Sequence, residues 1–182
     1  MNHDVIAAIN GLAVEALVAG CLPAEDAIDG VKALDWWHHG PNAGMLFWAD
    51  EETDLMGTGQ AVYYDVYLKQ TDRAWQSSTG GMLSTESMEE PLAEPLAEPL
   101  ADVTPGLHRF DGSSVGPVRM TWAVATPGVA GIRVVDRHGD VHERPPGRHG
   151  FVLLGTTAGD PITYAYAFDQ TGKELPGEPL ML

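Results

Sequence analysis

Apolar residues recur at helical spacing near the start of the chain. Positions 5, 9, 12, 16 and 19 are apolar and form one face of a helix from Val5 to Ala19. Asp4 precedes this stretch as a capping residue, and Gly20 follows it as a helix terminator. The pattern predicts a helix packed on a sheet. The alternative is a homodimer contact through the alanine-rich back of helix 5–19.

A second helix is predicted from Pro23 to Trp37. Its proline lies in the first turn, and Glu25 and Asp26 lie near the positive end of the helix dipole. Period-two alternation and turn residues then predict strands over residues 45–49, 61–70 and 73–77. The first half therefore predicts two N-terminal helices with a small antiparallel sheet, ending in a flexible stretch from Ser77 to Gly81.

The second half alternates over short stretches that are separated by glycine and proline turns. The predicted strands are residues 118–125, 131–136, 141–144, 151–154 and 162–168, followed by a turn at 169–172 and a short last strand. No helical pattern interrupts them, which is typical of an all-β sandwich. The predicted fold class is α+β, mostly antiparallel, with a C-terminal all-β sandwich.

Three segments of this half, GIRVVDRHGDV, GFVLL and ITYAYAFDQTGKEL, carry a resemblance. Residues 115–178 resemble bacterial immunoglobulin-like and fibronectin-III-like domains. No cysteine pair is present in this half, so antibody-type domains are not meant. The resemblance implies an Ig-like sandwich that recognises partners through surface loops, and it implies no single activity.

The tetrapeptide Pro-Leu-Ala-Glu recurs between the two halves, in EEPLAEPLAEPLAD at residues 89–102. Proline at every fourth position excludes a regular helix and argues against a central strand. We predict an extended, polyproline-like connector; the alternative is a ligand for a partner's groove. The predicted organisation is a helical and antiparallel-sheet lobe at 1–84, the connector at 85–104 and a sandwich domain at 105–182.

Acidic residues dominate the charge, with 26 Asp and Glu against 10 Lys and Arg and a net charge of −16. Residues 1–104 hold 18 acids and 3 bases, whereas residues 105–182 hold 8 acids and 7 bases. Phosphate backbones and anionic lipids repel such a chain, so neither nucleic acid nor membrane is expected as a partner. A protein partner is expected instead; the acidity either serves solubility or attracts a basic partner. The lone Cys21 and the absence of a signal-peptide pattern predict a cytoplasmic protein.

Two candidate chemistries are set aside. Residues 112–116 match the G-x-S-x-G pattern, but a hydrolase needs a helix after Ser114, and here Pro117 and an alternating strand follow. A polar loop is predicted there. Histidines 138, 142 and 149 lie close in sequence, but a hairpin does not bring residues four apart together as a helix does. We expect no catalytic residue, no metal and no cofactor.

The hairpin at residues 137–149 is the candidate partner-binding segment. It gathers positively charged and titratable side chains: Arg137, His138, His142, Arg144, Arg148 and His149. Because their charge is opposite to that of the connector, the connector could fold back on this hairpin.

The leading interpretation is a non-catalytic binding or protein interaction protein. The first alternative is a small-molecule binder or enzyme with an aromatic-lined pocket in the N-terminal lobe, built from Trp36, Trp37, Trp48, Tyr63 and Tyr67. The second is an inhibitor or immunity-type protein for a basic target.

Overall fold

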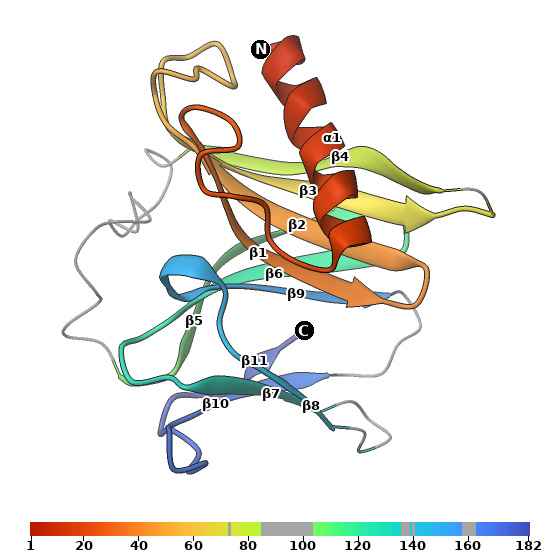
Figure 1. Ribbon diagram of the computed structural model, residues 1–182. Coiled ribbons are helices and arrows are strands. Elements are labelled where there is room, and N and C mark those ends of the chain that lie inside the picture. Colours follow the sequence, from red (N-terminus) through yellow and green to blue (C-terminus); the bar gives the residue numbers. More distant parts are fainter. Residues whose placement is uncertain (73, 85–103, 136–138, 140, 158–162) are drawn as a thin grey trace. The chain divides into compact units, whose positions relative to one another are not determined.

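The computed structural model describes the chain except residues 73, 85–103, 136–138, 140 and 158–162 (Figure 1). It divides into two compact units, Met1–Ala97 and Glu98–Leu182. The Pro-Leu-Ala-Glu repeat lies outside the described residues, so the extended connector stays a prediction. Among the described residues, no helix is both long and apolar enough to cross a membrane.

The described residues of the first unit form one helix and one four-stranded sheet. Its elements are α1 His3–Ala19, β1 Val31–His39, β2 Asn42–Ala49, β3 Val62–Gln70 and β4 Trp75–Ser84. The strands are antiparallel and neighbour one another in chain order, β1-β2-β3-β4. This sheet is called sheet A, and α1 packs across one of its faces (Figure 1).

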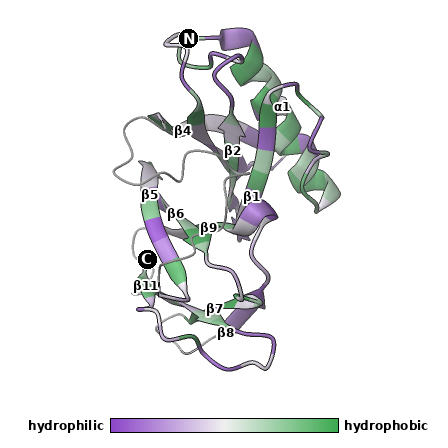
Figure 2. Ribbon diagram, turned by 90° about the vertical axis from the view of Figure 1, so that its left-hand side faces the viewer, coloured by the Kyte–Doolittle hydropathy of each residue, from purple (hydrophilic) through white to green (hydrophobic). Residues whose placement is uncertain are grey.

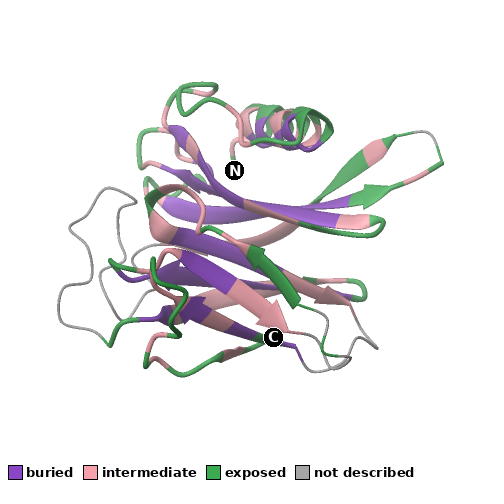
Figure 3. Cartoon of the chain, turned by 60° about the horizontal axis from the view of Figure 1, so that its bottom comes forward, coloured by how far each residue is buried: buried purple, intermediate pink, exposed green. Residues whose placement is uncertain are grey.

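Local signals set both ends of α1, and the predicted helix is confirmed. The side chain of Asn2 accepts a hydrogen bond from the backbone N–H of Val5, at 3.4 Å, so Asn2 caps the helix rather than Asp4. Gly20 ends it in a left-handed conformation, with φ of 70°, which glycine adopts without steric cost. One side of the helix is buried and the other is exposed (Figure 3).

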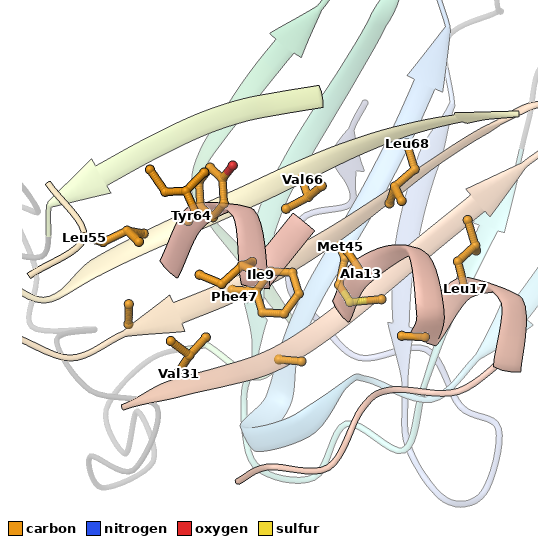
Figure 4. Packing of buried hydrophobic residues seen from close by; sticks show 14 of the residues in the cluster. Ile9, Ala13, Leu17, Val31, Met45, Phe47, Leu55, Tyr64, Val66 and Leu68 are labelled. Carbon is orange, nitrogen blue, oxygen red and sulfur yellow. The ribbon is translucent and has the colours of Figure 1, made fainter. Parts of the chain in front are cut away.

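The core of the first unit lies between α1 and sheet A. Figure 4 shows Ile9, Ala13 and Leu17 of the helix against side chains of the sheet, among them Met45 and Phe47. Each fully buried aliphatic or aromatic side chain of this kind contributes about 1.5–3 kcal/mol relative to an exposed one. Alternate residues of the strands therefore point to α1, which fixes which strand positions face the other side.

The prediction of a second helix is wrong. The predicted fold class is therefore also wrong, because it placed more than one N-terminal helix beside a small sheet. Gly30 has φ of 70°, a conformation that interrupts a helix, and its carbonyl accepts from the N–H of Asp50. Residues 31–39 then pair along their length with β2. Pairing with a neighbouring strand outweighs the weak helix-start signal of Pro23 and the acids that follow it.

The stretch from Ser77 to Gly81, predicted to be flexible, belongs to β4. Tyr64 pairs with Met82 and Val66 pairs with Thr79, so Gly80 and Gly81 together lie opposite Asp65. Two residues against one define a β-bulge, for which glycine is well suited. The glycines therefore serve the sheet and do not mark its end.

The second unit contains two antiparallel sheets. Its strands are β5 Leu107–Val115, β6 Val118–Ala125, β7 Gly131–Val135, β8 Val141–Arg144, β9 Phe151–Thr157, β10 Tyr164–Phe168 and β11 Leu180–Met181, with a short 3-10 helix, η2, at Arg148–Gly150. Sheet B has the order β5-β6-β9, and sheet C has the order β11-β10-β7-β8. Buried residues of both sheets form one core: Leu107, Ala123, Ala125, Ile132, Val152, Leu154, Ala165 and Ala167.

Most of the predicted strands in this unit are confirmed, and β5 is the exception. The strands at 118–125 and 141–144 have the predicted bounds, and the others differ at their ends. Residues 112–116, predicted as a polar loop, lie largely within β5, which mixes hydrophilic and hydrophobic positions (Figure 2). Because β5 is an edge strand of sheet B, its polar residues can face solvent while its backbone pairs with β6.

Candidate functional site

A row of apolar side chains crosses all four strands of sheet C on the face opposite its core. Val141 of β8 pairs with Val135 of β7, Val135 pairs with Tyr164 of β10, and Tyr164 pairs with Met181 of β11. Residues directly opposite each other in antiparallel strands project from the same face of the sheet. These four side chains therefore form one line across sheet C.

The line lies at the surface. Val141 is 51% exposed, Tyr164 38% and Met181 63%, while Val135 is half-buried. Single exposed apolar residues are ordinary, whereas these four form a contiguous line over four strands, which makes this face the candidate site. Together with Arg133, Glu143, Tyr166 and Phe168, which project from the same side, this line is called the outer face of sheet C.

Beside this line, the outer face contains an ion pair and an aromatic ring in contact with its arginine. Arg133 donates a hydrogen bond from Nε to Oε1 of Glu143 at 2.7 Å, and its guanidinium lies 5.4 Å from the centre of the Phe168 ring. The rings of Tyr164 and Tyr166 are 6.4 Å apart and inclined at 43°. The arginine is thus satisfied within the face, and three aromatic rings project along one strand.

Small residues on the inner side explain why the large side chains of β10 face outward. Ala165 and Ala167 alternate with the aromatic residues and are buried in the core shared with sheet B. Gly131 of β7 lies against the Phe168 ring, and a Cβ at this position would overlap the ring. The sequence of β10, YAYAF, therefore places its bulk on the surface and its alanines inside.

The chemistry of the outer face suits binding. Tyrosine, phenylalanine, methionine and arginine are the residues enriched in the buried centres of protein interfaces, and tyrosine and arginine recur among their energetic hot spots. The single pair of opposite charges on the outer face is already formed.

The predicted partner-binding residues that the structure describes are not part of the outer face. Arg137 and His138 lie outside the described residues. His142 is exposed on β8 in register with Val134, which packs toward the core, so it lies on the other side of the strand from Glu143. Binding through these residues stays a prediction.

Arg144, Arg148 and His149 belong to the folded part of the second unit. The Arg144 guanidinium donates from Nη2 to the Leu153 carbonyl oxygen at 2.7 Å, which links β8 to β9, and its Nη1 lies 3.4 Å from the Pro145 carbonyl oxygen. Arg148 and His149 form part of η2, where His149 has a positive φ of 55°. Arg144 is thus half-buried and engaged within the second unit.

The aromatic residues of the first unit divide between the two faces of sheet A. Trp36 packs against the core under α1, whereas Trp48 and Tyr63 pair with each other and project from the opposite face. The space under α1 is filled by buried side chains, which argues against a pocket between α1 and sheet A. The two-helix arrangement on which that pocket depended is absent from the described first unit.

The opposite face of sheet A holds buried polar groups. Lys32 lies with its Nζ 5.8 Å from the centre of the Trp48 ring, and the buried Nε1 of Trp48 has no hydrogen-bond partner among the described residues. Burial raises the pKa of Tyr63. The carboxylates of Asp35 and Asp65 are also buried, each in register with Leu46 on this face.

Neither of the chemistries set aside gains support from the geometry. Ser114 lies in β5 opposite Arg119, and the chain continues through a tight turn into β6, with no helix to expose the serine. Within the part of the chain that the structure describes, no three His, Cys, Asp or Glu side chains are grouped as a metal site.

Comparison with known proteins identifies no relative: no family model, curated protein or solved structure matches the chain. The resemblance of residues 115–178 to immunoglobulin-like and fibronectin-III-like domains therefore stays a prediction.

Proposed function

We propose that this chain is a non-catalytic protein that binds another protein through the outer face of sheet C. The observation that carries the proposal is the exposed line formed by Val141, Val135, Tyr164 and Met181 across four strands. Burying such a line against a partner removes apolar area from water. The free energy of the complex becomes more favourable by roughly 25 cal/mol for each Å² removed. Aromatic residues with few rotatable bonds lose little entropy when they become fixed.

The strand order of the second unit supports a recognition role. In constant-type immunoglobulin sandwiches, strands A, B, E and D form one sheet and C, F and G the other. Lettered in chain order, sheet B here has the order A-B-E and sheet C has the order G-F-C-D. The distribution differs only in strand D, which is β8 and pairs with β7. The strand order agrees with a binding function by analogy with such domains, but a fold alone does not set function, so the outer face carries the proposal.

Site-specific photo-crosslinking of the full chain tests the proposal. A photoreactive amino acid replaces Tyr164 on the outer face, and a matched control replaces Val18, which is 73% exposed on α1. We expect protein adducts from position 164 in extracts of the native cells, and loss of these adducts when Met181→Glu is added. Circular dichroism checks that each variant is folded.

Two outcomes would overturn the proposal. The absence of any adduct from position 164 would show that the outer face has no protein partner. Equal adducts from positions 164 and 18 would show that contact there is non-specific.

A second candidate, an inhibitor or immunity-type protein for a basic target, is favoured by the net charge of −16. Opposite charges accelerate association at low ionic strength, and salt screens this attraction. A partner recovered through position 164 that dissociates as salt rises would support this candidate. A partner held more tightly at high salt would exclude it.

A further inference from the structure

The strand β4 is an open edge of sheet A. It pairs with β3 on one side, and no described strand pairs with it on the other (Figure 1). It keeps a regular register with β3 from Trp75 to Thr79, where the glycine bulge interrupts it, and Gln76, Ser77 and Ser78 are exposed. An edge of this kind presents backbone groups on which a further strand can form.

The hydrogen bonds of the neighbouring strand show which backbone groups of β4 point outward. The N–H of Gln70 donates to the Pro41 carbonyl oxygen at 2.7 Å, so it points away from β4. Gln70 and Trp75 are in register, and they therefore form a non-hydrogen-bonded pair, whose N–H and C=O groups point away from each other. Such pairs alternate along an antiparallel ladder. Trp75, Ser77 and Thr79 consequently direct their N–H and C=O groups to the open edge.

The other described sheet edges carry features that hinder the addition of a strand. The edge strands β1 and β5 each contain a bulge. In sheet C, the edge strands β8 and β11 are only four and two residues long. On β9, the Leu153 carbonyl oxygen already accepts a hydrogen bond from Arg144. Among these edges, β4 combines an exposed, regular stretch with a sequence that contains neither a charged residue nor proline.

The charge of the first unit indicates which kind of strand fits this edge. Residues 1–84 hold 12 acids and 3 bases, a net charge of −9, whereas β4 itself is uncharged. This field attracts a basic segment and repels an acidic one, including a second copy of the first unit. We propose that β4 binds an extended, positively charged segment of another protein, which adds to sheet A as a further strand.

This surface belongs to the first unit, whereas the outer face of sheet C belongs to the second. The two surfaces also recognise different features of a partner. Strand addition uses main-chain hydrogen bonds, so it accepts many sequences, and the acidic surroundings select among them by charge. The outer face of sheet C offers apolar and aromatic side chains instead. The proposal therefore does not depend on binding through sheet C.

Amide hydrogen exchange of the full chain, followed by NMR, tests the proposal with a synthetic peptide of alternating lysine and valine residues. In the free chain, the outward N–H groups of Trp75, Ser77 and Thr79 should exchange fast, while those of Gln76 and Ser78, which face β3, exchange slowly. The peptide should slow exchange at the three outward positions about tenfold or more. A peptide with the same side chains and every backbone nitrogen methylated should leave their exchange unchanged, because it has no N–H to pair.

Ser77→Pro removes one outward N–H and keeps the side of the strand that pairs with β3, since proline is tolerated in edge strands where its nitrogen faces solvent. Isothermal titration calorimetry should show that it weakens peptide binding about tenfold or more. The matched control is Ser77→Ala, which loses the same hydroxyl, keeps the N–H and should bind as the wild type does. Ser77→Lys keeps the backbone and repels the basic peptide, so it should also weaken binding and serves if the proline variant does not fold.

Three outcomes would overturn the proposal. Slow exchange at the outward positions of the free chain would show that the edge is already covered, and by a second copy if the protection rises with protein concentration. No change in exchange at these positions on adding the lysine–valine peptide would show that the edge does not accept a strand. Equal binding of the methylated peptide, or of the wild type and Ser77→Pro, would show that charge alone holds the peptide. Crosslinking from position 164 is independent of these results, so the proposed function stands or fails separately.

Discussion

The side chain of Asp65 lies directly against the backbone of Gly80 in the neighbouring strand. Its Oδ1 accepts a hydrogen bond from the N–H of Gly81, and a Cβ at Gly80 would overlap the carboxylate. Asp65 is fully buried on β3, so the carboxylate cannot move into solvent to make room. The bulge in β4 thus depends on a glycine at position 80.

Replacement of Gly80 by alanine should therefore destabilise the protein. The added methyl must displace the Asp65 carboxylate or bend β4, and overpacking of this kind costs about 1–3 kcal/mol. Chemical denaturation measures the change in the free energy of unfolding.

Gly11→Ala is the matched control for the same added methyl group. No heavy atom lies within 4 Å of a Cβ built there, and Gly11 lies within α1. Alanine should stabilise the helix by about 0.5–1 kcal/mol. If both substitutions change stability in the same direction, steric overlap with Asp65 does not explain the glycine at position 80.

Alkaline pH should destabilise the first unit through Tyr64. Burial, with a contribution from the charge of Asp65, raises the pKa of Tyr64 from 10.0 to about 12. Between these values the unfolded chain loses the phenol proton before the folded chain does, so stability falls as pH rises from 10 to 12. The stability that this tyrosine preserves is fully present below pH 10.

Tyr64→Phe should make the free energy of unfolding fall less steeply over this pH range. At neutral pH the variant loses only the hydrogen bond from the Tyr64 hydroxyl to Asn10, which is 3.3 Å long. Denaturant titrations at several pH values, with tyrosinate absorbance followed in parallel, measure both effects. Identical slopes for variant and wild type would contradict this explanation.

Acid should remove the stability that the Asp169 carboxylate gives to the turn after β10. Its Oδ1 accepts hydrogen bonds from the Thr171 hydroxyl, the Thr171 N–H and the Lys173 N–H, at 2.6, 2.8 and 3.1 Å. The bond from the Thr171 hydroxyl is the largest of the effects that lower the pKa of Asp169 below 3.8. A lowered pKa stabilises the fold above 3.8, and the stabilisation is lost as pH falls through the lower value.

Asp169→Ala should accordingly be less stable than the wild type at neutral pH, and the difference should shrink in acid. Thermal unfolding at neutral and acidic pH measures the difference. Thr171→Val, which removes one of the three donors, should show a smaller effect with the same pH dependence. A difference that stays constant down to acid would show that the carboxylate charge does not contribute.

Arg144 should contribute to the stability of the second unit, because its guanidinium bonds to the Leu153 carbonyl oxygen of β9. Arg144→Ala removes this charge-assisted bond and should cost about 1.5 kcal/mol or more. Arg119→Ala, at an exposed position of β6, should change the free energy of unfolding by less than about 0.5 kcal/mol. Urea denaturation measures both variants. If they lose equal free energy of unfolding, the loss comes from removing a positive charge and not from the bond to the Leu153 carbonyl.

The elements predicted from sequence are those whose signals are local. Helix 5–19 has its caps and its apolar period within one segment, and strand 118–125 alternates regularly. Residues 31–37 fall within the predicted second helix, because Pro23, Glu25 and Asp26 resemble a helix start. Their strand conformation comes from pairing with β2, and a local pattern does not contain that partner.

The candidate site was missed for a related reason. The alternation of Tyr164, Tyr166 and Phe168 indicated a strand with one aromatic face, but hydrophobicity alone does not tell which face is buried. Here Ala165 and Ala167 face the core and the rings face outward. The small size of the two alanines was the available signal, since a close-packed core admits a small residue where a larger one would overpack it.

The order of the strands has a consequence for how quickly the two units fold. Each strand of sheet A pairs with the next one along the chain, so its contacts are local. In the second unit, Trp122 of β6 pairs with Leu153 of β9, and Val134 of β7 pairs with Ala165 of β10. Closing these longer loops costs more entropy before any contact forms, and folding rates fall as contacts become more distant in sequence. Amide protection should therefore arise in β1–β4 before it arises in β9 and β10 during refolding.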